Sequence, residues 1–296
     1  MRTGFHRYIL CCAPGPEYPF CTLSSTRRHV HSPVLVLSVL PACTVLGLTA
    51  NEIAAFQARD VTESNTGKKG SVSVTQDGDV YVLTSNGIPD HYADNYPNSD
   101  NPNSLVEQSY TWRIPVTPTP AASPGCLPQG PIGMAVNGVP IFNPFNRQCE
   151  DAVENEVLDR CDGHPAPGGA YHYHHEANCL PDNAESDSGP SGIVGVSFDG
   201  NAIYGPRGEN GTLLKHADLD PCHGITVNGT YRYHMTTDFP YFIGCYHGTL
   251  ASNSGLRSGR CDCDVQQYLN GGVSMVTSLA TVLTLGLSAL LIIYLM

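Results

Sequence analysis

The sequence predicts a mainly β fold: one domain that is cross-linked by disulfides and contains an internal pseudo-twofold repeat. Twelve cysteines in 296 residues, with only 14% charged residues, are typical of an oxidised, turn-rich β protein. Segments 133–144 and 195–206 align without gaps, and such self-similarity constrains the architecture before any local pattern does. Each segment contains a hairpin dipeptide, Asn137-Gly138 or Asp199-Gly200, which favours a two-residue type I′ turn.

The repeat extends beyond these hairpins. In each copy the hairpin is followed by a Leu-Asp-x-Cys segment, at 158–161 and 219–222, and then by a Tyr-x-Tyr-His strand, at 171–174 and 231–234. Two copies are too few for a solenoid. We therefore expect two halves, about 131–180 and 193–248, each a β-hairpin plus a Tyr-x-Tyr-His strand, to share one core.

Further elements lie outside the repeat. Residues 71–75 and 80–84 flank Asp77-Gly78 and predict an earlier hairpin. Residues 110–116 predict another strand, which Pro115 favours at a sheet edge. The helical candidates, 52–60 and 151–160, are both short.

The two ends of the chain indicate export. A basic cluster at 27–29 precedes an apolar run at 34–48, with a small-residue cleavage site at Thr49-Ala50, which together predict a secretory signal. Residues 273–296 carry no charge and follow small residues that begin at Asn270. This pattern is typical of a GPI signal with the lipid anchor on Asn270, and a membrane span is the alternative.

These features set the expected domain organisation and localisation. The expected divisions are an N-terminal extension and signal peptide (1–50), a linker (51–70), the domain (71–250), a cysteine-containing stalk (251–270) and a hydrophobic C-terminal GPI signal or span (271–296). We expect the protein to follow the secretory pathway to the extracellular face of the plasma membrane. The sequons at Asn210 and Asn228 predict glycosylation there.

Charge narrows the choice of partners. The chain carries 15 Lys and Arg against 27 Asp and Glu, a formal net charge of −12 at pH 7 with histidine neutral. Such a surface repels phosphate backbones, so no nucleic acid is expected as a partner. Metal cations or an extracellular partner are favoured instead.

Eight cysteines lie between residues 51 and 270, which predicts four disulfides in a secreted chain. Because Cys161 and Cys222 are equivalent in the repeat, and each is followed by another cysteine beyond its Tyr-x-Tyr-His strand, we expect two matching bridges. The expected pairs are Cys161–Cys179 and Cys222–Cys245, followed by Cys126–Cys149. Two cysteines, Cys261 and Cys263, remain ambiguous between a disulfide and a thiolate pair for a soft metal.

The segment 169–175 holds three histidines and two tyrosines. Residues two apart in a strand share a face, so His172 and His174 point one way while Tyr171 and Tyr173 point the other. Two imidazoles at this spacing can ligate one copper or zinc ion, although two ligands do not make a site. Further candidate ligands are His91, His164 and His234.

Other interpretations of the cluster stay open. Tyrosine and histidine pairs also stabilise strands as a purely structural network, and then the domain is a non-catalytic surface or matrix interaction module. Arg232 replaces His172 in the second copy, and a permanent cation repels a metal. A metal-assisted hydrolase is the third hypothesis, although no nucleophile motif is present. Three aspartates are candidates for orienting the imidazole rings: Asp159, Asp199 and Asp220.

The motifs taken together resemble the YHYH domain family. The resemblance rests on segments 85–91, 137–142, 158–164, 169–174, 198–206 and 233–241, in that order around the eponymous tetrapeptide. It covers roughly residues 71–248. The resemblance implies an exported protein and supports the domain boundaries, but it brings no established activity. Because His91, His164, His172, His174 and His234 lie in these motifs, it favours them over the remaining histidines.

Overall fold

The computed structural model describes residues 47–180, 189–255, 261 and 263–271. All of them belong to one of the two units into which the chain divides, residues 45–296. The expected signal sequence before Gly47 and the hydrophobic segment after Gly271 lie outside the described residues.

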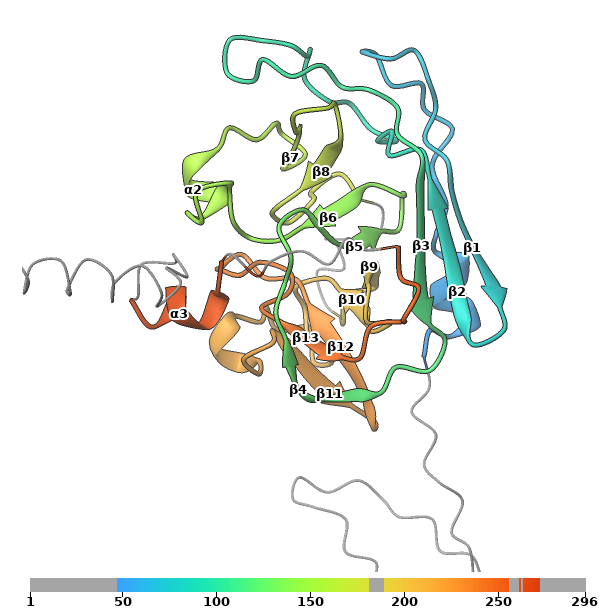
Figure 1. Cartoon of the computed structure of the whole chain (residues 1–296), viewed down its shortest axis with the longest axis vertical. Helices are drawn as coiled ribbons and strands as arrows, with labels where there is room; N and C mark the ends of the chain where they lie inside the picture. Colours follow the sequence, from blue (N-terminus) through green and yellow to red (C-terminus); the bar gives the residue numbers. More distant parts are fainter. Residues whose placement is uncertain (1–46, 181–188, 256–260, 262, 272–296) are drawn as a thin grey trace, which may run out of the picture. The chain divides into compact units, whose positions relative to one another are not determined.

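The described chain is mainly β, as predicted, and its largest sheet has eight strands (Figure 1). These strands are β5 (Pro131–Ala135), β6 (Pro140–Phe142), β7 (Gly163–Pro165), β8 (Tyr171–Tyr173), β9 (Ile193–Ser197), β10 (Ala202–Tyr204), β11 (Gly224–Val227) and β12 (Thr230–His234). Their order across the sheet is β11-β12-β10-β9-β5-β6-β8-β7.

The strands of the two sequence copies lie on either side of the central β5–β9 pair. Strands β5 and β9 are antiparallel, and each forms a hairpin with the next strand in the chain, β6 or β10. That strand pairs in parallel with a Tyr-x-Tyr-His strand, β8 or β12. The outermost strands, β7 and β11, close the two edges in antiparallel pairing. Corresponding strands therefore lie at equal distances from the centre of the sheet.

Both predicted central hairpins form, but their turns differ from the expected type I′. In each loop only the glycine has positive φ, 89° at Gly138 and 86° at Gly200. The amide of Ala135 donates to the carbonyl of Val139, and that of Ser197 donates to Asn201, so each loop has three residues. A three-residue hairpin loop needs a left-handed residue at its end only, which explains why asparagine and aspartate precede the glycines without adopting positive φ.

A three-stranded sheet packs against this core, in the order β1 (Val72–Asp77), β2 (Val80–Ser85) and β3 (Tyr110–Pro115). The predicted β1–β2 hairpin is confirmed, and β3 lies at a sheet edge. Contact with the large sheet is made by the ring of Trp112, 5.0 Å from that of Phe198, and by the Ser85 hydroxyl, which donates to the carbonyl of Gly138 at 2.6 Å. A two-stranded sheet, β4 (Pro120–Gly125) with β13 (Tyr246–Gly248), completes the strands of the described residues.

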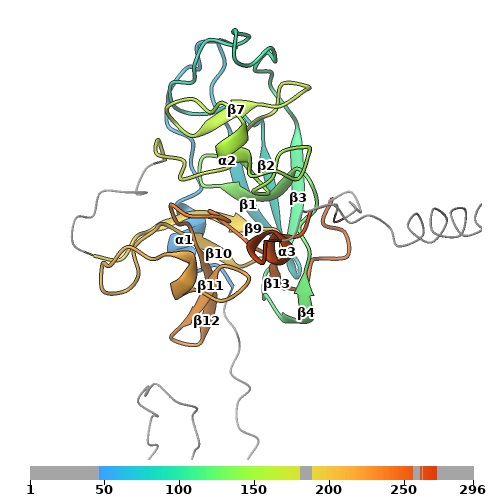
Figure 2. The same cartoon turned by 90° about the vertical axis from the view of Figure 1, so that its left-hand side faces the viewer.

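The helices are short, and two of them lie in segments where we expected a linker and a stalk. They are α1 (Ala50–Ala54), α2 (Ala152–Asn155), α3 (Val265–Leu269) and the 3-10 helix η1 (His216–Asp218), and the views in Figures 1 and 2 both place α2 beside β7. Thr49 caps α1, and Phe56 in the expected linker is only 6% exposed. Leu48 is buried as well, so the packed chain starts before residue 51. Among the helices of the described residues, none is long and apolar enough to cross a bilayer.

Four disulfides link the described chain. Two of them, Cys161–Cys179 and Cys222–Cys245, confirm the pairs expected from the repeat. The expected Cys126–Cys149 bridge is wrong. The remaining bridges are Cys126–Cys261 and Cys149–Cys263. The ambiguous cysteines are therefore disulfide partners, and the expected stalk is fastened to the domain by two bridges.

The C-terminal bridges lead to a test by single substitution. In Cys149→Ser we expect Cys263 to become the free thiol, and we expect stability to fall by about 3 kcal/mol, because Cys149–Cys263 closes a loop of its own even with the Cys126–Cys261 bridge in place. Thiol alkylation of the denatured, unreduced protein followed by peptide mass spectrometry identifies the free cysteine, and thermal unfolding measures the loss. Alkylation of Cys126 in this variant would support the Cys126–Cys149 pairing instead.

Candidate metal centre

Three histidines meet at the β7–β8 edge of the large sheet. His164 lies on β7 and His172 on β8, and the two are directly paired in the strand register. His174 follows β8 on the same face as His172, as the alternation of a strand predicts. All three side chains are buried, with residue exposures of 7%, 2% and 3%. The structure therefore unites three of the five predicted ligands.

The opposite face of β8 fixes this orientation. Tyr171 and Tyr173 are fully buried there, and a buried hydroxyl needs a hydrogen-bond partner. Tyr171 donates to Asp159 Oδ2 at 2.8 Å, whereas Tyr173 Oη accepts from Asn137 Nδ2 at 3.0 Å. With both tyrosines held on one face, the intervening histidine must face the other.

Each of the three imidazoles is oriented by a backbone carbonyl. The Nδ1 atoms of His164, His172 and His174 lie 3.0, 3.0 and 2.7 Å from the carbonyl oxygens of Val157, Ala170 and Asn143 respectively. A carbonyl oxygen only accepts, so Nδ1 must carry the proton in each ring. In a neutral imidazole, Nε2 then presents an unprotonated lone pair.

These three Nε2 atoms converge. His172 Nε2 and His174 Nε2 are 2.9 Å apart, and the ligand atoms of all three rings lie within 4.8 Å of one another. Glu156, just after α2, adds a carboxylate whose Oε2 lies 3.3 Å from His164 Nε2 and 3.5 Å from His174 Nε2. Facing lone pairs repel one another unless a proton or a cation lies between them. The arrangement is therefore that of a cation site with nitrogen and oxygen ligands.

Burial favours the neutral form of His172 and His174. It lowers the pKa of His172 well below the ordinary value, helped by its histidine neighbours, and it lowers the pKa of His174 to about 4. For Glu156, burial acts to raise the pKa, but the neighbouring His164 and His174 imidazoles outweigh it, so the net shift is downward. Neutral imidazoles and an ionised carboxylate are the forms that bind metal ions.

The cluster opens onto a pocket of about 430 Å³. The three histidines and Glu156 line it, together with apolar side chains and the amides of nearby asparagines. Phe142 stacks on the His172 ring with centroids 3.9 Å apart and so restricts that imidazole. The centre is thus buried from most sides and accessible from one.

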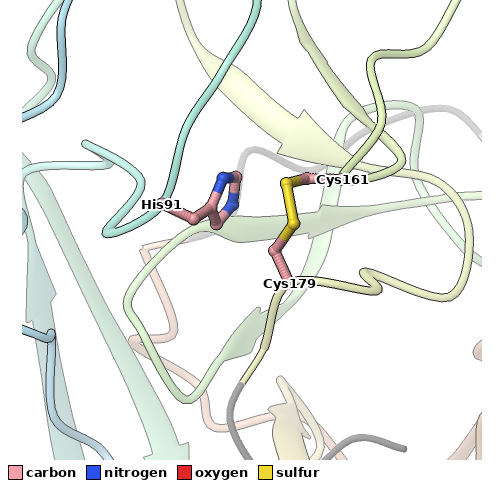
Figure 3. A group of neighbouring side chains, drawn as sticks. All are labelled: His91, Cys161 and Cys179. Atoms are coloured by element: carbon pink, nitrogen blue, oxygen red, sulfur yellow. A yellow bond between two sulfur atoms is a disulfide. The ribbon is translucent and has the colours of Figure 1, made fainter.

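His91 lies elsewhere, beside a disulfide (Figure 3). Its Nε2 is 2.6 Å from Tyr173 Oη, on the tyrosine face of β8. Its ligand atoms come near the sulfurs of Cys161 and Cys179, but these sulfurs are bonded to each other and are not thiolates. This second group is therefore a poor metal site, and His91 acts as a partner of the buried tyrosine.

His234 is also separate from the three histidines, because it belongs to β12 in the other half of the sheet. Its Nδ1 lies 2.8 Å from the carbonyl of Gly205, while its Nε2 accepts from Arg232 Nε at 3.0 Å. Both ring nitrogens are therefore used within the protein.

The groups that orient the metal-site rings differ from those expected. We considered Asp159, Asp199 and Asp220, but these carboxylates accept from the hydroxyls of Tyr171, Tyr233 and Tyr231. Glu156 was missed because it lies between the aligned segments of the repeat and in no motif. Its only sequence signal is its place within the short predicted helix 151–160.

Comparison with known proteins finds a likeness to one family over the segment that holds this site. The family model described as YHYH protein matches residues 111–213, which confirms the resemblance over the segment that carries all three clustered histidines. No curated protein matches the chain. No solved structure matches it either.

The buried histidines predict a stability change with pH. Burial lowers the pKa of His234 to about 4, against about 6.5 in the unfolded chain. The unfolded state then binds a proton that the folded state rejects, so the stabilising contribution is full above pH 6.5 and is lost as the pH falls towards 4. We expect the urea midpoint, measured with a chelator present, to fall over this range. His234→Gln should flatten the fall, and an unchanged slope would contradict this assignment.

Proposed function

We propose that the protein binds one divalent transition metal ion, copper or zinc, through His164, His172 and His174. The observation that carries the proposal is the convergence of three Nε2 lone pairs, each fixed by an Nδ1 hydrogen bond to a backbone carbonyl. Such partners commonly orient metal-ligating histidines. Imidazole ligands favour copper and zinc over calcium or magnesium.

Glu156 completes the proposed centre. Its carboxylate is close enough to two of the ring nitrogens to act as a further ligand or to accept a proton from metal-bound water. Three protein nitrogens with an accessible fourth position are typical of catalytic zinc sites, whereas structural zinc sites are closed by four protein ligands.

A metal-assisted hydrolase is a second candidate function, favoured by the pocket above the histidines. The bound metal would supply a Lewis acid there. In that function Glu156 accepts the proton, and the three histidines hold their Nε2 atoms towards the pocket. The alternative is a surface or matrix interaction module in which the tyrosine and histidine network is structural.

We propose, in addition, that the two halves of the domain are related by a pseudo-twofold axis between β5 and β9. The strand order supports this. Outward from the centre, the strands β5, β6, β8 and β7 of the first half correspond to β9, β10, β12 and β11 of the second, and each corresponding pair of neighbours is parallel or antiparallel in both halves. Only the first half carries the three histidines.

We propose a location on the extracellular face of the plasma membrane. Four disulfides support an oxidising compartment. The proposed glycosylation sites, Asn210 and Asn228, are both exposed, and Asn270 at the end of α3 is exposed as the proposed site of the GPI anchor. The acidic charge supports a metal or an extracellular partner and disfavours nucleic acid.

Metal content tests the proposed centre. The purified wild-type protein should hold one copper or zinc ion per chain by elemental analysis. The double variant His172→Ala with His174→Ala should lose it, with an affinity lower by more than about 100-fold in calorimetry, since even changes in groups around the ligands cost 10- to 100-fold. Glu156→Gln should weaken binding less.

His175→Ala is the matched control, because His175 neighbours the ligands but pairs with Asp162, 3.5 Å from its Nδ1. It should keep the metal. Equal metal content in wild type and the double variant would overturn the metal proposal and the hydrolase proposal, and would leave the interaction module. Retained disulfides and thermal unfolding of each variant report that the fold is intact.

The membrane anchor has its own test in eukaryotic cells. With a lipid on Asn270, a phosphatidylinositol-specific phospholipase should release the protein from intact cells. A chain truncated after Gly272 should be secreted without treatment, which controls for folding and export. Retention of the full-length protein after phospholipase treatment would favour a membrane span at residues 273–296.

A further inference from the structure

The second half of the sheet reproduces the framework of the metal centre with different side chains. Arg232 on β12 pairs with Ile225 on β11, as His172 pairs with His164 in the first half. The histidine that follows keeps its orientation, since His234 Nδ1 lies 2.8 Å from a carbonyl oxygen, as His174 Nδ1 lies 2.7 Å from one.

The guanidinium of Arg232 fills the space that faces this histidine. Its Nε donates to His234 Nε2 at 3.0 Å, and its Nη2 lies 2.5 Å from Glu209 Oε1. The side chain is 12% exposed. A lone pair and a carboxylate therefore surround a positive group, as three lone pairs and Glu156 surround the centre of the first half.

Each site is covered by an aromatic ring, and the two rings occupy corresponding positions on the sheet. Tyr204 ends β10 as Phe142 ends β6. The Arg232 guanidinium carbon lies 4.2 Å above the Tyr204 ring, whereas Phe142 stacks on His172. An arginine over a tyrosine face gains cation–π attraction, which adds to the ion pair and the hydrogen bond.

We infer that the second half contains a cation site of the same build as the metal centre, occupied by the protein's own guanidinium. When Arg232 is replaced by alanine, we expect this site to bind a small guanidinium cation from solution. When Ile225 and Arg232 are both replaced by histidine, we expect the site to bind a divalent transition metal ion. The guanidinium part stands on the contacts of Arg232 alone, while the metal part rests on the proposed function.

An arginine keeps this site filled under all conditions, because its guanidinium does not lose its proton in proteins. The second half is therefore held together without metal. The wild-type chain accordingly takes up one metal ion and not two.

The first experiment is chemical rescue of Arg232→Ala in the full chain. We expect millimolar methylguanidinium to raise the melting temperature of this variant by roughly 2–4 °C, because the ligand binds only the folded state. Wild type and Arg113→Ala are matched controls, since Arg113 makes an ion pair with Asp77 on the other sheet. Equal responses in all three proteins would overturn the inference.

The second experiment grafts ligands into the second half. Ile225→His with Arg232→His, placed in the His172→Ala and His174→Ala background, should bind one zinc or copper ion where the background binds none. Ile225 is 37% exposed, so a histidine there fits without repacking the core. A folded graft that takes up no metal would overturn the inference that the two sites have the same build. If the graft does not fold, the chemical rescue of Arg232→Ala decides the inference.

The two proposals fail in distinguishable ways. A wild-type chain without metal, together with a graft that binds one ion, would overturn the proposed function and support the inference. A wild-type chain with metal, together with no chemical rescue of Arg232→Ala, would support the proposed function and overturn the inference.

Discussion

The burial of two tyrosines on each Tyr-x-Tyr-His strand is the constraint on which the rest of the structure depends. Their phenol groups cannot lose their water contacts without protein partners, and carboxylates or amides of neighbouring loops provide them. This arrangement fixes the rotation of β8 and β12 about their own axes. The alternate residues are then presented on the other face, where the histidines or the arginine meet.

Close packing at two glycines supports the same constraint. At Gly163 an added Cβ would lie 2.5 Å from the Tyr171 ring, and at Gly224 it would lie 2.2 Å from the Tyr231 hydroxyl. Each glycine therefore lets its neighbouring strand approach the tyrosine closely. The Asp159 and Asp220 carboxylates, which receive the tyrosine hydroxyls, also accept backbone amides of the same turns. Strand, turn and disulfide are thus held as one unit in each half.

Sequence patterns predicted the features that depend on neighbouring residues. The hairpins, the shared face of His172 and His174, and the two disulfides within the repeat follow from spacings of a few to about twenty residues. The C-terminal bridges did not follow, because Cys261 and Cys263 reach partners 135 and 114 residues earlier in the chain. Glu156 and the carbonyls that orient the imidazoles were missed for a related reason. Backbone acceptors have no residue type, and only the folded chain brings them to the rings.

The two halves differ in the source of the positive charge that lies next to their buried histidine. In the first half the Nε2 lone pair of His174 lies 3.5 Å from the carboxylate of Glu156. In the second half the Nε2 lone pair of His234 and the carboxylate of Glu209 both contact Arg232, so each arrangement needs positive charge. In the second half an arginine supplies that charge permanently. The first half depends on a proton or, in our proposal, on a metal ion. The halves differ at two of the three ligand positions, where Ile225 and Arg232 stand in place of His164 and His172. This difference separates a half that holds its own arginine from a half with a candidate metal site.

The fastening of the C-terminal segment also bears on how the domain faces a membrane. The ring of Tyr268 in α3 packs on Phe145, 5.5 Å away, and Phe145 lines the pocket of the metal centre. Under the proposed anchor at Asn270, directly after α3, the chain offers no spacer between the folded domain and the lipid. The pocket would then lie close to the bilayer surface, where it would select molecules from the thin layer next to the headgroups and not from the bulk medium.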